Sequence, residues 1–165
     1  MTLSQNQYAE TFLKSLGAGS GPATFEAGRR VVRETLASWG VQASDIVYAD
    51  GSGLSRYDLV SAEALVAVLS HVAGDNRLNS LFQASLPVAG VAGTLSNRLT
   101  GTIAAGAVRA KTGSMSNVRS ISGYLKTADG EPVAFSIIAN NYAVPSAEID
   151  RVADAMLLEL VEFKR

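Results

Sequence analysis

The chain has 165 residues, of which 47% are hydrophobic and 18% are charged, and its formal net charge is −1. This length predicts a single domain over residues 1–165 with one sizeable core. The balanced charge excludes the concentrated basic face that nucleic-acid binding requires, and no apolar run is long enough for a membrane-spanning helix. With no cysteine and one histidine, His71, the sequence has no disulfides or thiolate metal site, and we expect no metal and no organic cofactor.

The first half of the chain is predicted to be helical. Apolar residues recur at helical spacing up to the glycine-rich stretch 17–21, and again after it. Ser61 is the expected N-cap of a later helix, in which His71 is a surface or boundary residue without a catalytic role. The expected elements are helices over 8–16 and 25–39, an extended run at 46–48, and helices over about 62–72 and 78–84.

The second half changes to the periodicity of strands. Residues 107–111 and 118–126 are expected to be extended, and Asp129-Gly130 indicates a two-residue hairpin turn before a third strand around 133–138. Pro145-Ser146 opens a last helix, whose apolar stripe should cover the sheet. The expected stripe consists of Ile149, Val152, Ala153, Met156, Leu157, Leu160 and Val161.

The predicted fold class is therefore α+β. Residues 1–105 are mainly helical, and residues 106–165 form a three-stranded antiparallel meander with a covering C-terminal helix. Three strands make a small sheet for this much apolar surface, and the edge next to Lys111 would be left open unless another segment pairs with it. We take this as an indication that strands are missing.

Two short motifs carry residues suited to acyl-transfer chemistry. Lys111-Thr112-Gly113 offers a cation, a hydroxyl and a position without a side chain, which suits the binding of a terminal carboxylate and of a substrate laid along the strand. Ser4-Gln5-Asn6 offers a hydroxyl for proton relay and an amide that holds a carbonyl. Each motif also has a purely structural explanation. Lys111-Thr112-Gly113 could be a surface strand that ends in a turn, and Ser4-Gln5-Asn6 could be the N-terminus of a helix.

Together and in this order, the two motifs resemble the Ser-x-Asn and Lys-Thr-Gly motifs of the penicillin-recognising serine transferases. The surrounding residues resemble one branch, the class C low-molecular-mass penicillin-binding proteins, which are D-Ala-D-Ala carboxypeptidase/endopeptidases. The resemblance runs over nearly the whole chain and implies part of a transpeptidase-type, β-lactamase-like domain. The segments that carry it are 4–10, 50–56, 93–95, 97–99 and 109–113.

The resemblance implies roles for individual residues. Ser4 would relay a proton to the leaving group and Asn6 would bind the acyl-side amide. Lys111 would hold the substrate carboxylate with Thr112 as a further donor, and the backbone after Gly113, around Ser114, would contribute to the oxyanion hole. The implied ligands are peptidoglycan stem peptides and β-lactams, and the family is periplasmic or extracytoplasmic. This chain shows no secretory signal and would be cytoplasmic as written.

The chain departs from the family pattern at the first motif, Ser-x-x-Lys, which supplies the nucleophile and general base. No serine of the sequence has lysine three residues later, and Ser122 with Lys126 lies in a predicted strand. We therefore expect a C-terminal part that lacks the preceding segment, natural or engineered, and that is inactive alone. A smaller departure is Asp58, where the family pattern favours asparagine.

Three functions remain open from the sequence. The chain could supply two walls of a carboxypeptidase site that another segment completes. It could be a non-catalytic assembly or binding module that pairs through its open sheet edge, with a second copy among the possible partners. It could also be a small esterase-like hydrolase that uses another serine, for instance Ser4 with Lys111 as the base.

Overall fold

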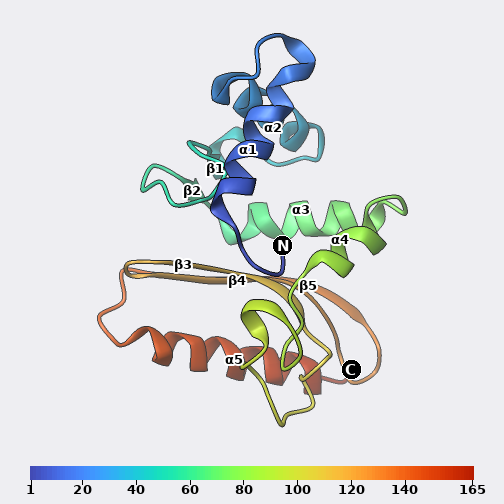
Figure 1. The fold of residues 1–165 in the computed structure, drawn as a ribbon. Helices are drawn as coiled ribbons and strands as arrows, with labels where there is room; N and C mark the ends of the chain where they lie inside the picture. The colour runs from blue at the N-terminus through green and yellow to red at the C-terminus, as the bar shows by residue number, and fades with distance from the viewer. The chain divides into compact units, whose positions relative to one another are not determined.

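The structure is a computed structural model that describes residues 1–165, apart from the side chain of Ser20. The chain forms two compact units, Ser4–His71 on the one hand and Val72–Arg165 with Met1–Leu3 on the other. Figure 1 shows the elements of both units in chain order. That the whole chain makes one domain stays a prediction.

The first unit is helical, as predicted, because apolar side chains recur at helical spacing. Thr24 caps the second helix by accepting a hydrogen bond from the N–H of Ala27 at 3.1 Å. Ser61 caps the third helix in the same way, as expected, through the N–H of Ala64 at 3.0 Å. The elements are α1 (Asn6–Leu16), η1 (Gly17–Ser20), α2 (Phe25–Ser38), η2 (Ala43–Asp45), β1 (Ile46–Val47), β2 (Leu59–Val60) and the start of α3 (Ala62–Gly74).

Helices α1 and α2 approach each other closely at Gly28. A Cβ atom at this position would lie 1.9 Å from the carbonyl oxygen of Leu13, so no side chain fits there. Leu13 itself is 2% exposed. The crossing of the two helices therefore depends on glycine at residue 28 and on the burial of Leu13.

A loop between the short antiparallel strands β1 and β2 is shaped by carboxylates. Asp50 accepts hydrogen bonds from the backbone N–H groups of Gly53 at 2.6 Å and Ser55 at 2.8 Å. Glu10 on α1 accepts the N–H groups of Gly51 and Ser52, each at 3.0 Å. These bonds satisfy the donors of a tight turn and fasten the loop to α1.

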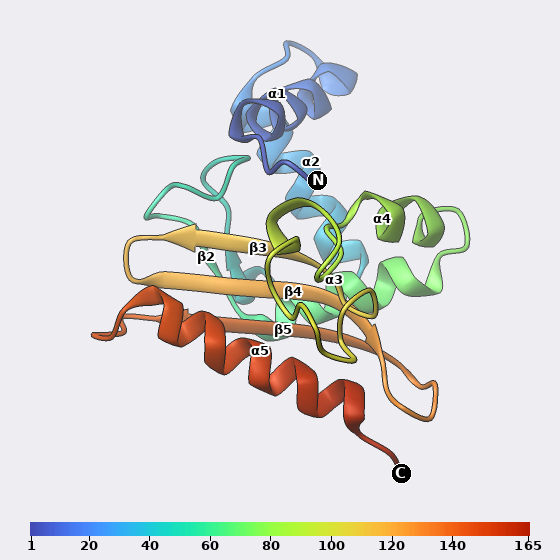
Figure 2. The ribbon, with the colours of Figure 1, turned by 60° about the horizontal axis from the view of Figure 1, so that its bottom comes forward.

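The second unit contains the sheet and its covering helix, which confirms the predicted α+β class. Strands β3, β4 and β5 follow one another in antiparallel order, and α5 lies along one face of the sheet (Figure 2). The elements that complete the unit are α4 (Asn79–Ser85), η3 (Gly93–Leu95), β3 (Arg109–Met115), β4 (Val118–Lys126), β5 (Pro132–Asn140) and α5 (Ser146–Glu162).

The turns of the sheet differ from the prediction. The expected two-residue turn at Asp129-Gly130 is wrong: Lys126 pairs with Pro132, and five residues, 127–131, connect β4 to β5. The hydroxyl of Thr127 holds this longer loop, because it donates to Asp129 at 2.5 Å and accepts the N–H of Glu131 at 3.0 Å. The two-residue turn is instead at 116–117, between β3 and β4.

The core lies between the sheet and α5, and the buried stripe of the helix is narrower than expected. Ala153, Leu157 and Val161 are buried, whereas Val152 and Met156 are 59% and 49% exposed. Residues four apart stack on one line of a helix, so one row faces the sheet while the neighbouring row turns away. The buried row packs in one cluster with Leu95, Val108, Ile121, Leu125 and Phe135.

An ion pair fastens the segment before the sheet to α5. The guanidinium of Arg98, whose side chain is 16% exposed, donates to Asp154 at 2.7 Å. It also donates to the backbone carbonyl of Asp150 at 3.1 Å. This bridge joins residues more than fifty positions apart and limits how the segment can move over the helix.

Candidate active site

The Lys111-Thr112-Gly113 motif lies in the middle of β3. The sequence predicted that the strand would end at Lys111, but it continues to Met115 because the tight turn at 116–117 leads directly into β4. Asn117 adopts a positive φ of 58°, a conformation that asparagine tolerates in such turns. The residues before and after the motif are therefore both part of the regular strand.

One edge of β3 is free along the motif. On its outer side, Arg109 forms an isolated bridge with Val88, and the N–H of Ala110 donates to the carbonyl of Pro87 at 3.0 Å. Since backbone groups alternate along a strand, Thr112 and Ser114 also direct their N–H and C=O groups outward. Beyond Ala110, the described part of the chain offers this edge no strand partner.

Lys111 brings a cation to this edge. Its Nζ donates to the carbonyl oxygen of Thr112, at 2.5 Å, and its stem is half-buried. Burial lowers the pKa of the Lys111 amine because it disfavours the charged form. Directly opposite in the register is Ser122, whose hydroxyl shares a 2.9 Å hydrogen bond with Ser136 on the third strand. A row of polar groups thus crosses the sheet at the level of the lysine.

The hydroxyl of Thr112 is oriented by a hydrogen bond to a residue outside the sheet. The hydroxyl of Thr112 donates to the hydroxyl of Thr94, in η3, at 2.9 Å. This bond uses the only hydrogen of the Thr112 hydroxyl, so the hydroxyl can form a further hydrogen bond only as an acceptor. Thr94 in turn keeps its own hydrogen for an acceptor.

The glycine of the motif, Gly113, lies next to a side chain of the neighbouring strand. A Cβ atom on Gly113 would lie 2.4 Å from the hydroxyl oxygen of Ser120, its partner on β4. A side chain at residue 113 would therefore force the hydroxyl of Ser120 to move, so glycine leaves room for this hydroxyl as well as for a ligand, the role that the sequence suggested. Ser114 follows on the strand and is exposed.

Ser4 and Asn6 are in the other unit and form a second group. Both are exposed, and the residue that precedes the helix is Gln5, with no side-chain capping bond. Ser4 has a positive φ of 48°, which is unusual for a residue other than glycine. Among the described residues, neither side chain forms a hydrogen bond. Lys111 and residues 112–114 thus belong to one unit, and Ser4 and Asn6 belong to the other.

The remaining residue singled out by the sequence, His71, is exposed and stacks on Trp39 with ring centroids 4.4 Å apart. In the described part of the chain, no cluster of histidine, aspartate or glutamate side chains could hold a metal ion. The same part contains no helix of the length and apolarity needed to cross a membrane.

Three residues of the site were not predicted: Thr94, Ser122 and Ser136. Thr94 stood in a segment recognised by resemblance, but nothing assigned it a contact. The two serines could have been found from the register, because recognising the turn at 116–117 places Ser122 opposite Lys111. Ser122 and Lys126 lie four residues apart in a strand, which separates them by about 13 Å and excludes a helical Ser-x-x-x-Lys pair.

Comparison with known proteins identifies relatives along the whole chain. The D-alanyl-D-alanine carboxypeptidase of Actinomadura sp. (strain R39) is 43% identical over 169 residues, covering 99% of this chain and 31% of the relative. The D-alanyl-D-alanine carboxypeptidase DacB of Haemophilus influenzae is 34% identical over 170 residues, covering 100% of this chain and 34% of the relative. The chain thus spans about a third of the length of these relatives.

Solved structures agree with these relatives. The chain superposes on penicillin binding protein 4 (dacB) from Haemophilus influenzae with a TM-score of 0.89 and 30% identity, covering 99% of this chain and 38% of that one. The same protein complexed with a novel β-lactam gives a TM-score of 0.89. This likeness confirms the penicillin-binding fold. The model of the D-Ala-D-Ala carboxypeptidase 3 (S13) family matches residues 1–160, and the chain belongs to this family of low-molecular-mass penicillin-binding proteins.

Proposed function

We propose that this chain supplies the Ser-x-Asn and Lys-Thr-Gly walls of a serine-type D-Ala-D-Ala carboxypeptidase/endopeptidase site that acts on peptidoglycan stem peptides. The free edge of β3 carries the proposal. Thr112 and Ser114 direct backbone groups outward there, beside the ammonium of Lys111. An extended peptide can add to such an edge as a further strand, with its terminal carboxylate near the cation.

The residues have distinct proposed roles. Lys111 attracts the terminal carboxylate, and Thr112 contributes a hydroxyl that Thr94 orients. The outward N–H of Ser114 is placed to donate to the oxygen that becomes negative when the scissile carbonyl is attacked. In the same scheme Ser4 relays a proton to the leaving amine, and Asn6 holds the amide on the acyl side.

No serine of this sequence is followed by lysine at the third position, which is the spacing of the family's nucleophile motif. We propose that the chain alone does not form an acyl-enzyme, and that a segment bearing Ser-x-x-Lys completes the site. In the complete site, serine would attack the peptide or β-lactam carbonyl, and the leaving nitrogen would take up a proton. Because the stem peptide lies outside the cytoplasmic membrane, we place the activity there.

Intact-mass spectrometry after incubation with a reactive penicillin tests the first part of the proposal. We expect no covalent adduct on the chain alone. A stoichiometric adduct would contradict the requirement for a second segment, and peptide mapping would then identify the nucleophile. An adduct on Ser4 that disappears in Ser4→Ala would instead support a small self-sufficient hydrolase.

Reconstitution tests the second part. The chain is mixed with the Ser-x-x-Lys-bearing portion of a close relative, and D-alanine release from a D-Ala-D-Ala peptide is measured. We expect release that falls at least about a hundredfold in Lys111→Ala and survives in Lys126→Ala, which removes an exposed lysine from the next strand. Failure of every matching segment to restore release would contradict the assignment.

A second candidate function, assembly without catalysis, is favoured by the same free edge. An unpaired strand edge is a template for pairing with another chain, and a second copy could pair there. Sedimentation distinguishes the two proposals. A dimer that is lost when Ser114→Pro removes an outward N–H would support assembly, whereas a strictly monomeric chain would count against it.

A further inference from the structure

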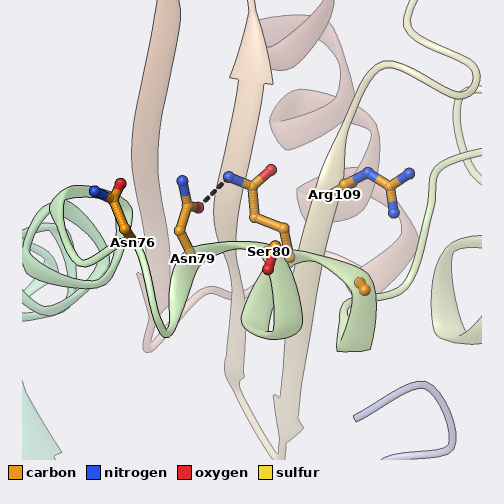
Figure 3. Close-up of a pocket in the computed structure, with 6 residues that line it drawn as sticks. Asn76, Asn79, Ser80 and Arg109 are labelled. Atoms are coloured by element: carbon orange, nitrogen blue, oxygen red, sulfur yellow. Dashed lines mark hydrogen bonds between the residues drawn. The ribbon is translucent and has the colours of Figure 1, made fainter.

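A second polar site lies on the same strand as the Lys-Thr-Gly motif. A cavity of about 390 Å³ opens between α4 and the start of β3. Figure 3 shows Asn79 and Ser80 on the helix and Arg109 on the adjoining strand. The lining consists of Asn76, Asn79, Ser80, Gln83, Ala84 and Arg109.

Arg109 is the charged group of this lining. Its side chain is half-buried, and it forms no ion pair or hydrogen bond with any described residue. Every other arginine in the second unit has a carboxylate partner there: Arg77, Arg98, Arg119, Arg151 and Arg165. No carboxylate lines the cavity, so the positive charge of Arg109 is not neutralised by its surroundings.

The amide groups beside Arg109 favour an acceptor. Gln83 donates through Nε2 to Oδ1 of Asn79 at 2.6 Å. This bond uses the oxygen of Asn79 and leaves its NH₂ group, together with one N–H of Gln83, without an acceptor among the described residues. The cavity therefore presents a cation and several neutral donors, a combination that matches an oxyanion with a single charge.

We propose that this cavity binds a carboxylate group through Arg109. The planar guanidinium matches a carboxylate in a two-bond geometry, and the amides of Asn79 and Gln83 can add neutral donors. A doubly charged phosphate would call for a second cation, which the lining lacks. Lys111 lies on the same face of the strand about 7 Å further along, but its Nζ is bonded to Thr112. The carboxylate is that of a peptide C-terminus or of an acidic side chain.

The test is an NMR titration of the isotope-labelled 165-residue chain, which reads binding without any acylation. The probes are N-acetyl-D-alanine, the acidic peptide acetyl-Glu-Glu-amide, and uncharged N-acetyl-D-alaninamide. We expect a carboxylate probe to shift the side-chain NH₂ signals of Asn79 and Gln83 and the Nε–H signal of Arg109, while the uncharged probe does not. Binding of N-acetyl-D-alanine alone would identify a peptide C-terminus, and binding of the acidic peptide alone an acidic side chain.

Variants decide whether Arg109 is the binding residue. Arg109→Gln should weaken binding at least about tenfold, since a hydrogen bond to a charged group is worth about 1.5–3 kcal/mol. Arg109→Lys should weaken it less. Arg77→Gln is the matched control, because it removes an equal charge next to Asn76 from a residue outside the lining. It should leave binding unchanged.

Two results would overturn the proposal. One is the absence of shifts at Asn79 and Gln83 with both carboxylate probes. The other is equal affinity in the chain and in Arg109→Gln. If Arg109→Gln loses the dispersed NMR spectrum of a folded chain, the proposal is tested by the titrations of the parent chain and of Arg109→Lys. Neither the NMR shifts nor the affinities depend on D-alanine release, so the absence of carboxylate binding in this cavity would not contradict the proposed peptidase role.

Discussion

The backbone N–H of Asp50 donates to Oδ1 of Asp58 at 3.3 Å, at the base of one loop. Oδ1 of Asp58 also accepts the N–H of Ala49 at 2.6 Å, while its Oδ2 is buried and has no hydrogen-bond partner among the described residues. Burial raises the pKa of Asp58, and the neighbouring carboxyl group of Asp50 raises it further. Burial acts against the charge of Asp50 as well, but hydrogen bonds, among them those from the N–H groups of Gly53 and Ser55, leave its pKa lowered. We infer that Asp58 Oδ2 carries a proton and donates it to the carboxylate of Asp50.

The shared proton predicts how stability depends on pH. The pKa of Asp58 is higher in the folded than in the unfolded chain, so its contribution is complete below the unfolded value and is lost as the pH rises through the folded value. The pKa of Asp50 is lower in the folded chain, so its contribution is lost as the pH falls through the folded value. We expect the free energy of unfolding, measured in urea, to decrease from mildly acidic toward neutral pH.

Asp58→Asn should remove this decrease and stabilise the chain at neutral pH. An asparagine amide donates to Asp50 at every pH, and we expect a gain of about 1 kcal/mol. Glu63→Gln, which removes an equal charge from an exposed position in the same unit, should change neither the slope nor the stability. A variant Asp58→Asn that is less stable than the parent at neutral pH would show that no proton is shared.

Arg98→Ala should destabilise the chain by about 2–3 kcal/mol, because it leaves Asp154 and the carbonyl of Asp150 without their donor in a half-buried setting. Arg151→Ala breaks an exposed pair with Glu148 and should cost less than about 0.5 kcal/mol. Urea unfolding of both variants gives the comparison, and equal losses would contradict a structural role for Arg98.

Gly28→Ala should cost at least about 2 kcal/mol, because the new methyl group meets the backbone of α1 at Leu13 and the helices must move apart. Gly19→Ala in the same unit meets no atom within 4 Å and should be nearly neutral. Thermal unfolding followed by circular dichroism distinguishes the two. Similar melting temperatures would show that the helix crossing adapts without cost.

The amine of Lys111 should titrate below the usual range of a lysine, because burial lowers its pKa. The ¹³Cε chemical shifts of labelled lysines, followed with pH, measure this titration, and Lys111→Arg assigns the signal. Titration of Lys111 within the usual range of lysine would contradict the burial of the amine.

Regular elements could be predicted where one local pattern decides them. The predicted bounds of 118–126 agree with β4, and the helices over 8–16 and 25–39 agree with α1 and α2 to within a few residues. The strand β2 could not be predicted, because two residues carry no period and its pairing with β1 is a tertiary contact. The turn at 116–117 was missed because Ser-Asn is a weaker turn signal than the Asp-Gly that falls in the longer loop.

The candidate site could be predicted only where the chemistry is contiguous in the sequence. Lys111, Thr112 and Gly113 are adjacent, so their grouping needed no knowledge of the fold. The bond from Thr112 to Thr94 spans 18 residues and depends on how a loop folds back over the strand. That dependence on tertiary packing is also why the unpartnered charge of Arg109 could not be read from the sequence.

The order of the sheet has a consequence for how this region folds. Strands β3, β4 and β5 each pair with their neighbour in sequence, through connections of two and five residues. Short connections cost little loop-closure entropy, and such local pairing is associated with rapid folding. We therefore expect residues 109–140 to acquire protection from hydrogen exchange early during refolding, before the pairing of β1 with β2.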